Sequence, residues 1–243
     1  MPLAFGSLFA GIGGIDIGFE RAGMRCKWQV EIDSYANRVL EKNWPTVARW
    51  DDIKTFPPAY GAWQVDVIAG GFPCQDISYA GKGAGLDGER SGLFYEACRV
   101  IRLLGPGYVV LENVSALLDR GMGDVLGTLA SLGFDVEWHC LPASSFGAHH
   151  RRDRVFIIAT SPNAYRVRFK VPGARSAGVW SDEQFTELVL GAERMAVPAG
   201  NRSGILDGVS NRAHRLRGLG NAVVPQIAEY IGNALQDANK GKR

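Results

Sequence analysis

Short apolar runs alternate with segments of helical spacing along the first 160 residues. Apolar strands are predicted over 4–11, 27–33, 65–71, 108–114, 134–141 and 154–160. Between them, apolar residues recur at helical spacing over 15–22, 34–44, 92–104 and 125–133, which predicts amphipathic helices. Strands that alternate with helices in this way predict an α/β fold, a parallel sheet with helices on both faces.

The pattern dissolves beyond residue 160. Residues 161–210 carry scattered Pro, Gly, Arg and Ser, with one predicted helix at 181–195 that begins with a capping box. A helix over 225–235 then resumes the earlier pattern. We therefore expect a main domain over 1–160, a small insertion over 161–210, and a segment over 211–243 that returns to the main domain.

Charge is unevenly distributed, although the net charge is only +2. Residues 161–220 contain nine Lys or Arg against five Asp or Glu, so the remainder of the chain is slightly acidic. A basic segment of this kind indicates either a polyanionic partner on one face or simply a solvated basic surface.

Composition excludes several classes of protein. No apolar run approaches the ~20 residues of a membrane span, and the N-terminus lacks the charged region of a signal peptide. The four cysteines lie far apart without a CxxC pair, which argues against a zinc site or a disulfide framework. We expect a protein of a reducing compartment, the cytoplasm, with no bound metal.

A glycine-rich loop, Phe9–Gly14, separates the first predicted strand from the first helix. Such loops allow backbone N–H groups at a helix N-terminus to approach a ligand, although a tight structural turn has the same composition. Glu31 lies at the end of the next strand, where a carboxylate can bind ribose hydroxyls. Asp52 and Ile53 could hold an adenine amino group and cover its face. Together these residues indicate a nucleoside cofactor.

Four chemically distinctive residues lie near the ends of later strands. Cys74 follows the strand at 65–71, Glu112 lies near the end of the next, and Arg152 and Arg154 lie at the start of another. Ligand crevices of open α/β sheets form at the carboxyl ends of strands, so these groups are expected to converge beside the cofactor. Taken singly, Cys74 could be a buried structural thiol and Glu112 an ion-pair partner. The two arginines could belong to a solvated basic surface.

These residues belong to motifs that occur in a known order. FAGIGG at 9–14, PCQ at 73–75, ENV at 112–114, RDR at 152–154 and GNAV at 220–223 together resemble the DNA cytosine-5 methyltransferases, in particular small phage or bacterial members. The resemblance covers about 1–160 and 211–236. It implies a Rossmann-like, class I S-adenosylmethionine-dependent methyltransferase fold with a small target-recognition insertion.

The implied reaction is methyl transfer from S-adenosyl-L-methionine to C5 of cytosine in duplex DNA, at a short sequence, leaving S-adenosyl-L-homocysteine. The resemblance implies that Cys74, Glu112, Arg152 and Arg154 are catalytic. It implies cofactor contacts by Phe9, Gly11, Gly13, Gly14, Glu31, Ile32, Asp52, Ile53, Pro73, Leu93, Asn221 and Ala222. Expected DNA contacts are Gln75, Ser78, Arg90, Arg166 and Arg168.

The chain departs from the family pattern at three places. His150 stands where Gln is usual, Ser7 stands where an acid is common, and the target-recognition segment is short. Three alternatives remain: an RNA (tRNA) cytosine-5 methyltransferase, which the absence of a CFT tripeptide disfavours, a catalytically silent DNA-binding module, and a nicotinamide-linked oxidoreductase. We expect a prokaryotic or phage-encoded monomer that acts on duplex DNA, alone or with a companion restriction endonuclease.

Overall fold

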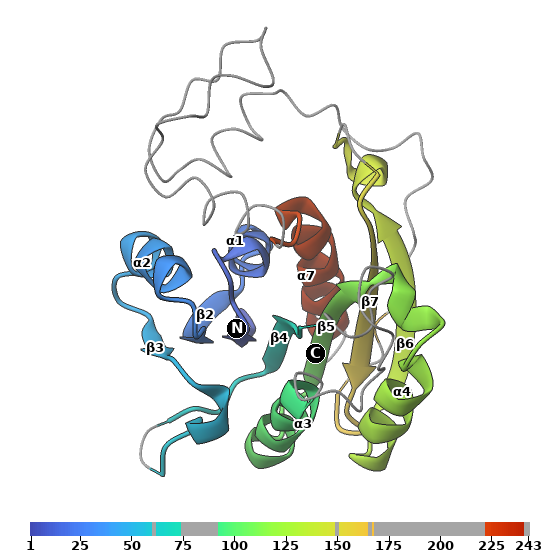
Figure 1. The fold of residues 1–243 in the computed structure, drawn as a ribbon, viewed down its shortest axis with the longest axis horizontal. Helices are drawn as coiled ribbons and strands as arrows, with labels where there is room; N and C mark the ends of the chain where they lie inside the picture. Colours follow the sequence, from blue (N-terminus) through green and yellow to red (C-terminus); the bar gives the residue numbers. More distant parts are fainter. Residues whose placement is uncertain (60–61, 74–91, 149–150, 165–166, 168–221, 241–243) are drawn as a thin grey trace, which may run out of the picture.

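Seven strands form one mixed sheet in the part of the chain that the computed structural model describes, namely residues 1–59, 62–73, 92–148, 151–164, 167 and 222–240. The strand order is β3-β2-β1-β4-β5-β7-β6, seen from left to right in Figure 1. The strands are β1 (Ala4–Leu8), β2 (Arg25–Val30), β3 (Ala48–Trp50), β4 (Val67–Gly71), β5 (Tyr108–Val114), β6 (Asp135–Pro142) and β7 (Asp153–Thr160). The α-helices are α1 (Gly14–Arg21), α2 (Ser34–Asn43), α3 (Gly92–Leu104), α4 (Met122–Ser131) and α7 (Pro225–Lys240).

Side chains of the central strands alternate between two apolar layers. Ile68 and Val109 face α3 and α4, whereas their neighbours Val67 and Val110 face α1 and α7. This is the period-two alternation of a strand that is buried on both faces. The predicted α/β layering is confirmed. The loops that join strands to helices therefore lie at the two ends of the strands. Within the described ranges, no helix combines the length and the apolar character needed to cross a membrane.

Small residues let α1 and α7 pack at close range. A Cβ on Gly18 would lie 2.5 Å from the Cβ of Ala228, and a Cβ on Gly14 would lie 2.3 Å from the carbonyl oxygen of Val223. Both distances are far below van der Waals contact, so these positions require glycine. The close packing holds the segment at Ala222 and Val223 against the first turn of α1, although about 200 residues separate them in sequence.

The prediction of a parallel sheet was wrong for one strand. β7 runs antiparallel to both β5 and β6. Only a short connection containing η4 (Ala143–Phe146) joins β6 to β7, and parallel neighbours need a crossover of a dozen or more residues. The chain therefore returns beside β6 in the opposite direction, which brings the start of β7 to the edge where β4 and β5 end.

One further difference concerns a short strand. β3 was not predicted, because three residues with one large apolar side chain carry no recognisable period. β5 spans Tyr108–Val114 and matches the predicted strand, with Glu112 two residues before its end. The predicted insertion at 161–210, including its helix at 181–195, lies outside the described residues except for 161–164 and 167.

Candidate active site

A cleft of about 380 Å³ opens at the carboxyl ends of β1, β2, β4 and β5. Its volume lies within the ~300–1,000 Å³ typical of sites for small molecules. Twelve of the predicted site residues line it: Phe9, Gly11, Gly14, Glu31, Ile32, Asp52, Ile53, Pro73, Leu93, Glu112, Arg154 and Ala222. Gly13 and Arg152 are described but do not line the cleft. Cys74, Gln75, Ser78, Arg90, His150, Arg166, Arg168 and Asn221 lie outside the described residues.

The glycine loop forms the floor of one end of the cleft. Phe9, Gly11 and Gly13 have φ values of 52°, 56° and 89°. A non-glycine residue in this region is uncommon, and Phe9 in such a conformation at the rim of a cleft marks a functional loop. Gly13 supports the loop from behind, because it caps α1 and a Cβ there would lie 2.5 Å from the Trp44 ring.

Glu31 is fixed at the mouth of this loop. Its Oε2 accepts from the N–H of Gly11 at 2.7 Å, and its Oε1 accepts from the N–H of Asp33 at 2.8 Å. Burial raises the pKa of this carboxyl, and the two backbone hydrogen bonds act in the opposite direction. The neighbouring Ile32 is 75% exposed although it is apolar. A carboxylate with a set orientation beside an exposed apolar side chain suits a ligand with both hydroxyl groups and a flat ring.

A polar network beneath the glycine loop joins three elements. The Ser7 hydroxyl on β1 donates to Oδ2 of Asp16 on α1 at 3.1 Å, and Gln29 Nε2 on β2 donates to Oδ1 at 2.9 Å. The Cys26 thiol also donates to Oδ1, at 3.6 Å. Ser7 replaces an acid that is common in the family, and the buried carboxyl beside it comes from α1 instead. Sequence reasoning missed Asp16, because its partners lie on separate elements.

Asp16 is expected to make folding stability dependent on pH. Burial raises its pKa to about 6 from the usual 3.8, although three side-chain hydrogen bonds and one backbone hydrogen bond oppose the shift. The folded state therefore binds a proton that the unfolded chain has lost, so this contribution falls as pH rises from about 4 to about 6 and stays constant above that range. This pKa difference of about two units between the folded and unfolded states corresponds to about 3 kcal/mol of folding free energy.

Asp16→Asn should remove that contribution, because an amide fits the same three partners and does not titrate. Urea unfolding of both proteins at pH 4, 5, 6 and 7 measures it. The stability of the natural chain relative to Asp16→Asn should fall across this series. Parallel pH curves for the two proteins would show that Asp16 does not titrate in the folded state in this range.

Glu112 lies at the other end of the cleft. Nε of Arg154 is 2.9 Å from Glu112 Oε1, and the two side chains are only 21% and 10% exposed. Burial raises the pKa of Glu112, while the positive charges of Arg154 and then Arg152 lower it in part. Oε1 receives no well-aligned hydrogen bond from any described residue.

Strand register explains this pair. Val114 on β5 pairs with Arg154 on β7, which could not occur if β7 ran parallel. Gly71 pairs with Glu112 across β4 and β5, and a Cβ on Gly71 would lie 2.8 Å from Glu112 Oε2. The glycine thus leaves room for the carboxylate to lie against the backbone just before Cys74.

The side chains of Asn113 and Arg152 hydrogen-bond to backbone segments that line the cleft. Asn113 Nδ2 donates to the carbonyl oxygen of Phe72 at 3.3 Å, two residues before Cys74. Nη2 of Arg152 donates to the carbonyl oxygen of Ala222 at 2.8 Å, so it ties the start of β7 to the wall of the cleft. Burial, followed by the charge of Arg154, lowers the pKa of Arg152. Arg152 thus contacts the wall of the cleft without lining it. It is close enough to Glu112 to lower the pKa of that carboxyl.

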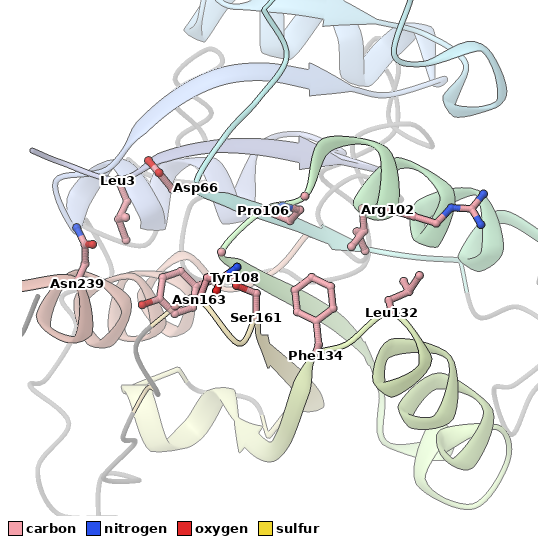
Figure 2. Close-up of a pocket in the computed structure, with 14 residues that line it drawn as sticks. Leu3, Asp66, Arg102, Pro106, Tyr108, Leu132, Phe134, Ser161, Asn163 and Asn239 are labelled. Atoms are coloured by element: carbon pink, nitrogen blue, oxygen red, sulfur yellow. The ribbon is translucent and has the colours of Figure 1, made fainter.

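A second cavity, of about 440 Å³, lies at the opposite edge of the sheet (Figure 2). Its walls include Asp66, Phe134 and Asn163, and none of the predicted site residues lines it. Across the described ranges, no group of three or more His, Cys, Asp or Glu could hold a metal ion. Of the two cavities, the cleft at the carboxyl ends of the strands is therefore the candidate active site.

Residues 3–179 match the family of C-5 cytosine-specific DNA methylases. The chain belongs to this family. Among its curated relatives, Type II methyltransferase M.BanI of Aneurinibacillus aneurinilyticus is 39% identical over 170 residues, which is 65% of this chain and 38% of M.BanI. Type II methyltransferase M.BsuFI of Bacillus subtilis is 35% identical over 67% of this chain and 40% of the relative. The matched segments thus span about two fifths of these relatives.

Solved structures share the fold of this chain. A candidate DNA modification methyltransferase encoded within an E. coli prophage has a TM-score of 0.68 at 18% identity, covering 98% of this chain and 99% of that one. Methyltransferase EhMeth of Entamoeba histolytica has a TM-score of 0.66 at 13% identity, covering 98% of each chain. The predicted methyltransferase fold is confirmed.

Proposed function

We propose that this chain transfers a methyl group from S-adenosylmethionine to C5 of cytosine in duplex DNA. The observation that carries the proposal is that one cleft has the glycine loop with Glu31 at one end and buried Glu112 at the other. One end is equipped to hold a nucleoside and the other to protonate a base. Family membership supports the same reaction.

The residues of the cleft fit the cofactor. Glu31 presents a carboxylate for ribose hydroxyls, and Asp52 presents one for an adenine amino group. Ile32, Ile53 and Leu93 supply apolar surface of the kind that covers a purine ring. When bound, S-adenosylmethionine supplies an electrophilic methyl group on a positively charged sulfur.

The chain's own residues activate the cytosine. The Cys74 thiolate adds to C6, and Glu112 gives a proton to N3, so that negative charge does not accumulate on the ring. C5, now enamine-like, takes the methyl group. A base, for which we propose water, removes the C5 proton. The thiolate leaves C6, and N3 returns its proton to Glu112. The target base must first leave the helical stack, because its C6 face is inaccessible inside a duplex.

Bisulfite sequencing of DNA from a host that expresses the chain tests the proposal. New 5-methylcytosine should appear, and the purified protein should methylate duplex DNA with labelled S-adenosylmethionine. Transfer to tRNA but not to DNA would instead favour the RNA alternative. Since relatives are named Type II methyltransferases, we further propose a prokaryotic or phage-infected cytoplasm as the setting, a monomer as the active species, and a companion endonuclease as a partner.

Glu31→Ala is expected to weaken binding of S-adenosylhomocysteine by about 10–100-fold. The substitution removes a charge-assisted hydrogen bond to the ribose, worth about 1.5–3 kcal/mol, and releases the N–H of Gly11. Isothermal titration calorimetry measures the affinity. Glu41→Ala, on the exposed side of α2, is the matched control and should bind normally. Unchanged affinity in Glu31→Ala would remove Glu31 from the cofactor site.

We also expect a short recognition sequence, about two to four base pairs, with binding that weakens strongly as salt rises. Each base pair that is read well contributes about 1–3 kcal/mol, and a segment of about fifty residues rich in Gly and Pro offers few rigid side chains. Methylome sequencing of the expressing host measures the site. A defined site of six or more base pairs would contradict the expectation, and methylation only with a second protein would show that the partner reads the sequence.

A further inference from the structure

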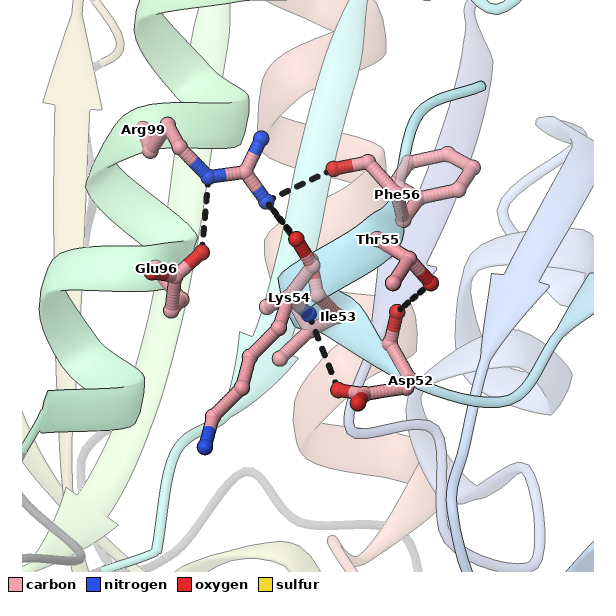
Figure 3. A network of polar contacts seen from close by, with 7 residues as sticks. All are labelled: Asp52, Ile53, Lys54, Thr55, Phe56, Glu96 and Arg99. Carbon is pink, nitrogen blue, oxygen red and sulfur yellow. Dashed lines mark hydrogen bonds and ion pairs between the residues drawn. The ribbon is translucent and has the colours of Figure 1, made fainter.

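Arg99 on α3 contacts a turn that lies far from it in sequence (Figure 3). Its Nη2 donates to the carbonyl oxygen of Ile53 at 2.7 Å and to that of Phe56 at 2.8 Å. Its Nε forms an ion pair with Glu96 Oε2 at 2.7 Å. The turn that it contacts is η1 (Ile53–Thr55), one wall of the cleft.

The opposite end of η1 is held by Asp52. Oδ1 of Asp52 accepts from the N–H of Lys54 at 2.9 Å, which caps the turn. Oδ2 makes no hydrogen bond with a described residue, so it is the oxygen left to meet a ligand in the cleft. Its direction therefore depends on the position of η1.

The chemistry of an arginine side chain suits it to hold η1 in place. Carbonyls at the end of a helical turn carry partial negative charge, and the Ile53 carbonyl that Arg99 contacts also accepts from the N–H of Phe56 at 3.2 Å. A guanidinium is planar and permanently charged, so its Nη2 can donate to both carbonyls while its Nε pairs with Glu96. The contact also fixes η1 relative to α3, and Leu93 in the first turn of α3 lines the same cleft.

We propose that Arg99 is a positioning residue for adenine recognition. It holds η1 so that Asp52 meets the exocyclic amino group while Ile53 and Leu93 lie on either side of the ring. This inference rests on the proposed function, since it assumes that the cleft holds an adenosyl cofactor. Arg99 itself does not line the cleft and acts through the turn.

Calorimetry with two ligands tests the proposal. S-adenosylhomocysteine carries the amino group, and S-inosylhomocysteine carries an oxygen in its place, which Asp52 should repel. Arg99→Met should bind S-adenosylhomocysteine about tenfold more weakly, equivalent to one charge-assisted hydrogen bond, and should lose most of the preference for it. Arg99→Lys should recover part of both. Arg102→Met, one turn further along α3 on the wall of the other cavity, should behave as the natural chain.

The outcomes separate the two claims. If the natural chain binds S-adenosylhomocysteine and Arg99→Met binds it equally well, the role of Arg99 is wrong and the proposed function stands. An equal loss for both ligands in Arg99→Met also overturns the role, because it shows general damage rather than adenine recognition. If the natural chain binds neither ligand, the proposed function fails, and the role of Arg99 fails with it.

Discussion

Glu112→Gln is expected to lower the rate of methyl transfer by about 10²–10⁴-fold, the usual contribution of general acid–base catalysis. The amide keeps the shape of the carboxyl but cannot give a proton to N3. Affinity for S-adenosylhomocysteine should stay within about twofold, because Glu112 lies at the end of the cleft remote from Glu31. Single-turnover methylation and calorimetry on the same variant measure the two quantities.

The pH dependence gives a second test of this role. Burial raises the pKa of Glu112, so the folded protein keeps the protonated form to higher pH than an exposed glutamate would. The rate of methyl transfer should fall as pH rises through that pKa, and this limb should be absent in Glu112→Gln. The roles of Glu112 and Glu31 would be misassigned if Glu112→Gln lost cofactor affinity while it methylated normally.

Cys74→Ala is expected to abolish methyl transfer, with a loss of at least about 10⁴-fold, the scale seen when a catalytic nucleophile is removed. Without the thiolate no bond forms at C6, and C5 of an intact cytosine is a poor nucleophile. Glu112 and the cofactor cleft are untouched, so binding of S-adenosylhomocysteine should be preserved.

Cys140→Ala is the matched control, since Cys140 is an exposed free cysteine on β6 at the side of the sheet away from the cofactor loop. It should methylate at the natural rate. Appreciable turnover by Cys74→Ala would exclude covalent catalysis by that thiol and would favour a different reaction in the same cleft.

Much of the fold could be predicted because strand and helix periods are local properties of the sequence. The run at 67–71 is apolar throughout, and α3 repeats its apolar residues at helical spacing, so each was assigned the correct type. The positions of Glu31 and Glu112 in one cleft also followed, because parallel strands end at the same edge of a sheet.

Long-range partnerships could not be predicted, because they depend on the direction of strands and on packing. Arg154 meets Glu112 only because β7 is antiparallel, and the apolar run at 155–159 reads the same in either direction. Arg152 binds the carbonyl of Ala222, seventy residues away, and Arg99 reaches Ile53 from a separate helix. An isolated arginine on a predicted helix gives no indication of which carbonyls it will bind.

The most direct measurement uses duplex DNA that carries 5-fluorocytosine at the methylated position. Once the thiolate has added to C6 and the methyl group has reached C5, fluorine cannot leave as a proton does, so elimination is blocked and the covalent complex persists. After incubation with S-adenosylmethionine and proteolysis, mass spectrometry should find the modified nucleotide on the peptide that contains Cys74. An adduct on Cys26, Cys98 or Cys140, or full methylation of unmodified DNA without any trapped complex, would contradict covalent catalysis by Cys74.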